Sequence, residues 1–142
     1  MSSGFSILNV PTITRLTWEL YNQCQPVVKY APDGFQSLVE QLVSLRGTLR
    51  ALADDITSNP SFFEKMNEQR KHTLERCLNA CFQTLQRLKT LLDQYREMGI
   101  GEGKLFWQRV GWITQQTQIE EIRSQIMVHS FNLNLWMSSV GK

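Results

Sequence analysis

The 142-residue sequence has few residues that break or crosslink a chain, with 4 Pro, 8 Gly and 3 Cys. So little Pro and Gly excludes collagen-like and low-complexity segments as its main content. The cysteines are odd in number, and Cys77 and Cys81 lie one helical turn apart, which argues against a disulfide framework. No apolar run reaches the roughly 20 residues of a membrane-spanning helix, and the start lacks the basic region of a secretory signal. We therefore expect a single domain in a reducing compartment, the cytoplasm.

An excess of charge of one sign is also missing, since 15 Lys and Arg stand against 13 Asp and Glu, giving a formal net charge of +2. A dedicated nucleic-acid binder needs a basic face that neutralises phosphates, so we expect no nucleic-acid partner. In contrast, 42% of the residues are hydrophobic, which is enough for a packed core.

The sequence shows no pattern of catalytic or metal-binding residues. His72 and His129 lie in no signature that combines a nucleophile, a base and an orienting acid. The glycines and lysine of residues 99–104 lack the Ser or Thr and the first Gly of a phosphate-binding loop. Cys77 and Cys81 have no second ligand pair at zinc spacing, so small core residues are the better interpretation. We expect no enzyme activity, no cofactor and no metal.

Apolar residues recur every three or four positions along almost the whole chain, which predicts an all-α fold. A first helix should begin at Pro11 and Thr12 and end or kink at Pro26. A second should begin at Pro32 and Asp33, with an apolar stripe that continues to Ile56.

The second half of the chain predicts a short turn and two more helices. Ser61 and Glu64 form a capping-box pattern for the turn. Residues 67–73 are polar, which indicates a loop or a solvated helix start before a stripe over residues 74–95. Thr117 and Glu120 form a second capping-box pattern for the last helix. Its expected stripe comprises Ile119, Ile122, Ile126, Phe131, Leu135 and Val140.

Four principal helices with short connections pack most simply as an antiparallel four-helix bundle with short extra helical turns. Residues 1–142 would form this single domain.

The first 26 residues carry only two charged side chains, Arg15 and Glu19. One interpretation is that this segment is the most buried helix of the bundle. The other is a releasable helix that enters lipid once a trigger frees it, because a helix satisfies its own backbone and offers apolar side chains. The candidates for a membrane-active segment are Phe5, Ile7, Leu8, Ile13, Leu16, Trp18 and Leu20.

Three tryptophans are candidates for interaction anchors, because exposed indoles often dominate interface energetics. They are Trp107, Trp112 and Trp136, and core packing is the alternative for each. A basic cluster over residues 65–76 fits a solvated helix surface, or a site for anionic lipid or an acidic partner.

Five segments, in order, resemble the N-terminal helical domains of fungal NLR-like (STAND/NACHT) receptors, grouped with the HeLo-like family. They are residues 4–6 (GFS), 91–99 (LLDQYREMG), 104–112 (KLFWQRVGW), 119–126 (IEEIRSQI) and 129–134 (HSFNLN).

This resemblance implies a HeLo-like bundle, comparable with that of the necroptosis executor MLKL and with the coiled-coil domains of plant NLRs. It implies a signalling or executor domain of fungal innate immunity or heterokaryon incompatibility, in which oligomerisation exposes an N-terminal segment that permeabilises the plasma membrane. The expected partners are further copies of the chain, anionic membrane lipids and a nucleotide-binding domain downstream in the same, larger protein. A non-lytic interaction domain or an autoinhibitory bundle remains the alternative.

Overall fold

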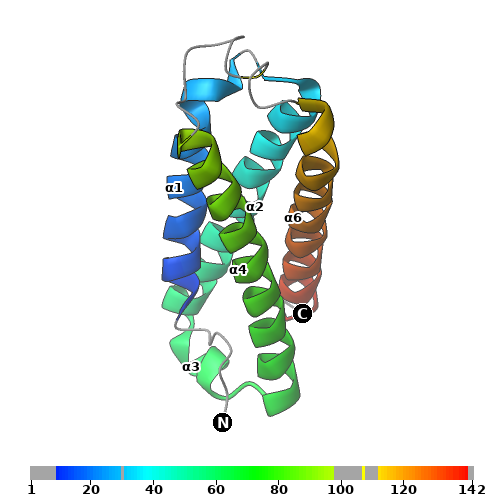
Figure 1. The fold of residues 1–142 in the computed structure, drawn as a ribbon. Coiled ribbons are helices and arrows are strands. Elements are labelled where there is room, and N and C mark those ends of the chain that lie inside the picture. Colours follow the sequence, from blue (N-terminus) through cyan, green and yellow to red (C-terminus); the bar gives the residue numbers. More distant parts are fainter. Residues whose placement is uncertain (1–8, 30, 98–106, 108–111, 141–142) are drawn as a thin grey trace.

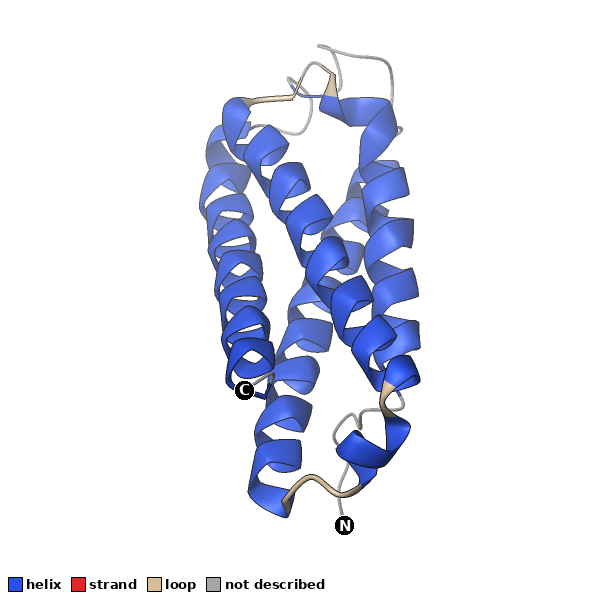
Figure 2. Ribbon diagram, turned by 180° about the vertical axis from the view of Figure 1, so that it is seen from behind, coloured by secondary structure: helices blue, strands red, loops and turns tan. Residues whose placement is uncertain are grey.

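Four long helices and one short helix make up the described chain (Figure 1). The computed structural model describes residues 9–29, 31–97, 107 and 112–140, and these residues contain helices and loops but no strand (Figure 2). The predicted all-α helical bundle is confirmed. The elements are α1 (Val10–Val28), α2 (Asp33–Ser58), α3 (Pro60–Glu64), α4 (Glu68–Glu97) and α6 (Trp112–Val140).

The long helices form a ring in which α1 packs against α2 and α4, and α6 packs against the same two helices. Consecutive long helices run in opposite directions, so the bundle is antiparallel along the chain (Figure 1). The neighbours α2 and α6, however, run parallel, as do α1 and α4. The chain therefore passes from α2 to α4 across the diagonal of the bundle, and α3 lies in that crossing.

Leucine is the commonest core residue, and in α2 and α4 the leucines recur every three or four residues, which places them on one face of each of these two helices. At the end of the bundle where the chain crosses, Phe63 of α3 stacks on Trp136 of α6, with ring centroids 6.1 Å apart. Met66, between α3 and α4, is also buried. The crossing segment thus closes the core at this end.

Pro26 does not end the first helix, which continues to Val28. A proline in the last turn removes only its own N–H from the hydrogen-bond ladder, so two further residues can stay helical. The carbonyls beyond it find other partners. Val27 O accepts from Trp107 Nε1 at 2.9 Å and Val28 O accepts from the Ala31 N–H at 3.1 Å.

Both expected capping boxes are wrong. Asn59 is the residue before α3, Ser61 lies inside that helix, and no side chain caps its start. Helix α6 begins at Trp112, so Thr117 lies inside it as well. The Ser/Thr-x-x-Glu spacing equals one helical turn and is therefore equally compatible with a helix interior.

The polar start of the third long helix is confirmed, since α4 begins at Glu68. The residue that caps it is Asn67, whose Oδ1 accepts a hydrogen bond from the Arg70 N–H at 2.9 Å. Such a bond satisfies one of the free amide groups at a helix start.

The last helix differs from its expected stripe beyond Ile126. Phe131 and Leu135 are 65% and 58% exposed, whereas Leu133 and Trp136 are buried. The buried stripe passes through the small Ser130, which the apolar pattern did not mark. The side chain of Val140 lies outside the described residues.

Candidate interaction surfaces

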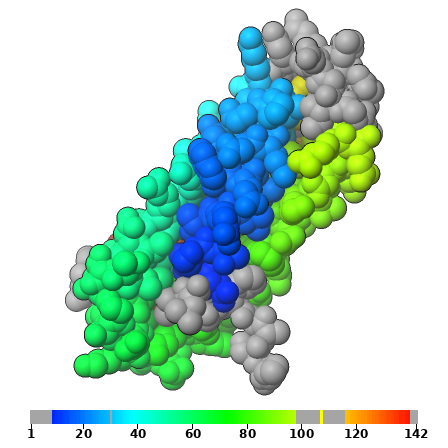
Figure 3. All heavy atoms as spheres, turned by 90° about the vertical axis from the view of Figure 1, so that its left-hand side faces the viewer, coloured from blue at the N-terminus to red at the C-terminus, as the bar shows by residue number. Residues whose placement is uncertain are grey.

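Helix α1 lies on the outside of the bundle, along α2 and α4 (Figure 3). It is not enclosed by the other three helices. One stripe of the helix is buried, and Thr12, Arg15 and Glu19 are among the residues that face solvent. The buried residues are Val10, Ile13, Thr17, Leu20, Cys24 and Val27.

The candidate membrane-active residues fall into three groups. Phe5, Ile7 and Leu8 lie outside the described residues. Ile13 and Leu20 are fully buried, and Leu16 is partly buried against the core. Trp18 alone of the described candidates is exposed, at 40%. Among the described helices, none is both long enough and apolar enough to cross a membrane.

Trp18 is held by two ring contacts. Its indole stacks on Tyr21 with ring centroids 5.5 Å apart. The guanidinium of Arg46, on α2, lies 4.0 Å from the centre of the indole ring. Cation–π contact of this kind is favourable and fixes the tryptophan against α2.

Trp107 is a core residue. Its side chain is buried, its ring lies 4.8 Å from Phe35 and 6.0 Å from Tyr95, and its Nε1 donates to Val27 O. These contacts join the end of α1, the start of α2 and the end of α4. Core packing thus accounts for Trp107, which is not available as a surface anchor in this bundle.

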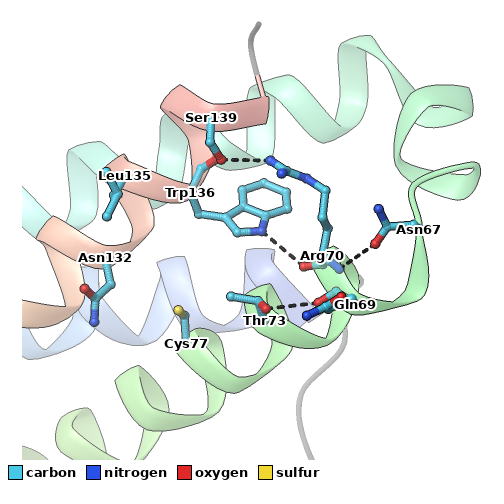
Figure 4. A pocket seen from close by; sticks show the side chains of 9 residues that line it. All are labelled: Asn67, Gln69, Arg70, Thr73, Cys77, Asn132, Leu135, Trp136 and Ser139. Carbon is cyan, nitrogen blue, oxygen red and sulfur yellow. Dashed lines mark hydrogen bonds between the residues drawn. The ribbon is translucent and has the colours of Figure 1, made fainter.

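Trp136 is also buried, and it links α6 to the start of α4 (Figure 4). Its Nε1 donates to the backbone oxygen of Arg70 at 3.1 Å, and the Arg70 guanidinium donates to Ser139 Oγ at 2.8 Å. Core packing accounts for this residue too. Trp112 is the first residue of α6, and its side chain lies outside the described residues.

Four of the seven exposed large hydrophobic side chains among the described residues are on α6, which was not expected from the sequence. Met127, Val128, Phe131 and Leu135 are 45%, 54%, 65% and 58% exposed. Their spacing of three and four residues places them on one outer face. We call these four residues the α6 outer face. The signal in the sequence is that residues 124–140 contain no Asp, Glu, Lys or Arg.

A groove of about 690 Å³ separates the start of α4 from the end of α6 beside this face (Figure 4). Leu135 belongs to both the groove and the α6 outer face, while Cys77 lines the α4 side. The basic cluster over residues 65–76 contributes Arg70 here, and this arginine is engaged with Ser139. Arg70 therefore serves to join α4 and α6.

A polar seam joins α4 and α6 further along. Thr84 Oγ1 lies 2.7 Å from His129 Nε2 and 3.2 Å from Gln125 Oε1. Arg87 pairs with Glu121 at 2.9 Å. Burial lowers the pKa of His129, because desolvation disfavours the imidazolium.

The cysteines lie in surroundings that keep them protonated. Burial raises the pKa of Cys24 and that of Cys81 to about 12, and it raises the pKa of the half-buried Cys77. A thiol needs a lowered pKa to act as a nucleophile or metal ligand at neutral pH. Within the described parts of the chain, no three His, Cys, Asp or Glu side chains come together to hold a metal ion.

A scan against protein-family models, a search of curated proteins and a search of solved structures each find no match to this chain. The resemblance to fungal NLR-like receptors therefore stays a prediction from the sequence.

Proposed function

We propose that this bundle is a signalling domain that works by self-association through the α6 outer face. Four large apolar side chains, each 45% exposed or more, lie together on one outer face of α6, and the main exposed apolar patch of a monomer is often a functional surface. This patch is the observation that carries the proposal.

The absence of Asp, Glu, Lys and Arg from residues 124–140, the second half of α6, favours a second copy of the chain as the occupant. A twofold contact between copies uses the same surface of both chains, so charges of one sign on that surface would repel the same charges on the other copy. Residues 124–140 have only His129 as a titratable side chain, and His129 contacts Thr84 at the seam with α4. A partner of opposite charge would find no group to pair with on this face.

The executor step of the proposal is that association releases α1 to an anionic membrane, as the resemblance to fungal immunity and incompatibility receptors implies. Support comes from the place of α1 on the outside of the bundle (Figure 3). Exposing its four buried aliphatic side chains, Val10, Ile13, Leu20 and Val27, costs on the order of 10 kcal/mol at about 1.5 to 3 kcal/mol each. That cost equals the whole stability of a typical domain, so contacts between copies and with lipid must offset it.

The alternative is a non-lytic interaction domain that uses the same α6 outer face and keeps α1 docked. The inward orientation of Ile13 and Leu20 favours it, because their apolar surface is already buried by the bundle.

Sedimentation at increasing concentration tests the self-association. Val128→Ser and Phe131→Ser should each weaken it about tenfold or more, because a half-buried apolar anchor at an interface contributes at least about 1.4 kcal/mol. The chain offers matched controls at similar exposure on other helices, Val43→Ser on α2 and Phe62→Ser on α3. A wild-type chain that stays monomeric, or controls that weaken association equally, would refute the α6 contact.

Leakage from anionic liposomes separates the executor from the alternative. The full chain, fused to an inducible dimerising domain, should release a trapped dye once it is oligomerised. Thr12→Glu with Trp18→Glu should reduce leakage strongly, because charged side chains on α1 oppose its entry into lipid. The matched control places glutamates on exposed positions of α4, Gln83→Glu with Gln86→Glu. If the oligomer forms and no dye is released, the executor step is refuted and the non-lytic interaction domain is the function that stands.

A further inference from the structure

A second groove, of about 410 Å³, lies between the first half of α1 and the second half of α2. Three arginines line it, Arg15 from α1 and Arg46 and Arg50 from α2. Asp54 is the one carboxylate among its lining residues, so the groove has a net charge of +2 from three cations and one anion.

Among the described residues these three arginines have no carboxylate partner, as is also true of Arg70, Arg76 and Arg96 on α4, but only here do three such cations line one groove. Arg87, Lys89 and Arg123 pair with Glu121, Asp93 and Glu120 at 2.9 to 3.0 Å. In the described residues, by contrast, no carboxylate oxygen lies within 4 Å of Arg15, Arg46 or Arg50. Asp54, which also lines the groove, has no cationic partner within 4 Å in the same described part of the chain.

The packing of α1 on α2 brings these like charges together. Arg46 and Arg50 are four residues apart, a spacing at which like charges on a helix repel. The groove adds Arg15 from the opposite helix. Because the fold gathers three cations and pairs none of them, a bound anion would remove an unfavourable interaction.

One of the three guanidinium groups is already held in position. Arg46 lies over the exposed Trp18 at 4.0 Å, and Trp18 is stacked on Tyr21. Less side-chain freedom is then lost when a ligand binds, which favours affinity. The stack also gives the groove an aromatic wall next to its cations.

We infer that this groove binds the phosphate group of a phosphate monoester. Guanidinium groups present planar pairs of N–H donors that match phosphate oxygens, and a dianionic phosphate can accept from more than one of them. A volume of about 410 Å³ is in the lower range for small-ligand sites. A groove of this size suits one phosphate monoester group, either of a small soluble ester or of a lipid head group.

The two sources of the phosphate can be separated with a matched pair of probes. Glycerol 3-phosphate supplies the soluble group, and vesicles of phosphatidylcholine with phosphatidic acid supply the same group on lipid. Calorimetric titration of the full chain measures the first and co-sedimentation measures the second, with pure phosphatidylcholine vesicles as the blank. Binding of glycerol 3-phosphate assigns a soluble ester, and binding of the vesicles alone assigns a lipid head group.

The variants test whether the groove is the site. Arg15→Gln and Arg50→Gln should each weaken binding about tenfold, and the two together should abolish it. The affinity of Arg50→Lys should lie between that of the wild type and that of Arg50→Gln, because lysine keeps the charge and loses the planar pair of donors. Both positions are exposed, so thermal melting should be unchanged.

The control is Arg96→Gln, which removes the same charge from an exposed position in the last turn of α4. It should bind both probes like the wild type. Failure of the wild type to bind either probe overturns the inference, and so does an equal loss of binding in Arg96→Gln. The groove is lined by residues of α1 and α2 and not by the α6 outer face, so the outcome of these assays is independent of the self-association through α6.

Discussion

The three cysteines show, at the scale of single residues, how burial decides what a side chain can do. Cys24 and Cys81 are fully buried, and burial raises the pKa of each to about 12, whereas Cys77 is half-buried and lines the groove between α4 and α6. Because the thiolate is the reactive form, a disulfide reagent should label Cys77 first. Cys24 and Cys81 should react only when the chain unfolds.

Mass spectrometry of labelled peptides distinguishes the three sites. The variant Cys77→Ser should abolish the fast phase of labelling and leave the slow phase intact. Labelling of Cys24 or Cys81 as fast as that of Cys77 would show that α1 or α4 opens under native conditions.

Single residues also show where sequence reasoning succeeds. Of the two cysteines predicted as small core residues, Cys81 is buried in the core, whereas Cys77 is only partly buried and lines the groove between α4 and α6. The arginine groove could not be predicted in the same way. Arg46 and Arg50 belong to the polar face of a helix, and their proximity to Arg15 exists only once α1 has packed against α2.

At the scale of elements, a single apolar stripe was sufficient to predict a helix and its buried face. Helix α2 begins at the expected Asp33, and its stripe of leucines is buried. Helix α6 carries two apolar stripes, one through Leu133 and Trp136 and the other through Phe131 and Leu135. The pattern of such a helix cannot show which stripe faces the core, because the choice depends on the shape of α2 and α4.

At the scale of the whole molecule, the order of the four long helices around the bundle cannot be deduced from the sequence of any one helix. Short connections suggest that consecutive helices are neighbours, yet α2 and α4 lie across the diagonal and the chain joins them through α3 (Figure 1). The apolar stripes of the helices are compatible with a bundle in which α2 and α4 are neighbours and equally with one in which they lie across the diagonal. The order depends on contacts between distant residues, such as the hydrogen bond from Asn134 Nδ2 to Thr48 Oγ1 at 3.1 Å.

The seam between α4 and α6 makes the stability of the whole bundle depend on pH through His129. Its neighbours there, Thr84 and Gln125, are uncharged, and burial lowers the pKa of the imidazole below its ordinary 6.5. The unfolded chain therefore binds this proton at a higher pH than the folded chain does. The free energy of unfolding should then decrease as the pH falls from about 6.5 to the lowered pKa of the folded state.

Urea denaturation at a series of pH values between about 7.5 and 5.5 measures this dependence, in a range above the titration of ordinary carboxylates. His129→Gln should flatten it, because the variant has no imidazole to protonate at the seam. The exposed His72→Gln is the matched control and should retain the dependence of the wild type. A wild-type bundle whose stability stays constant over this range would mean that the seam accommodates the imidazolium, through rearrangement of Thr84 and Gln125 or through water.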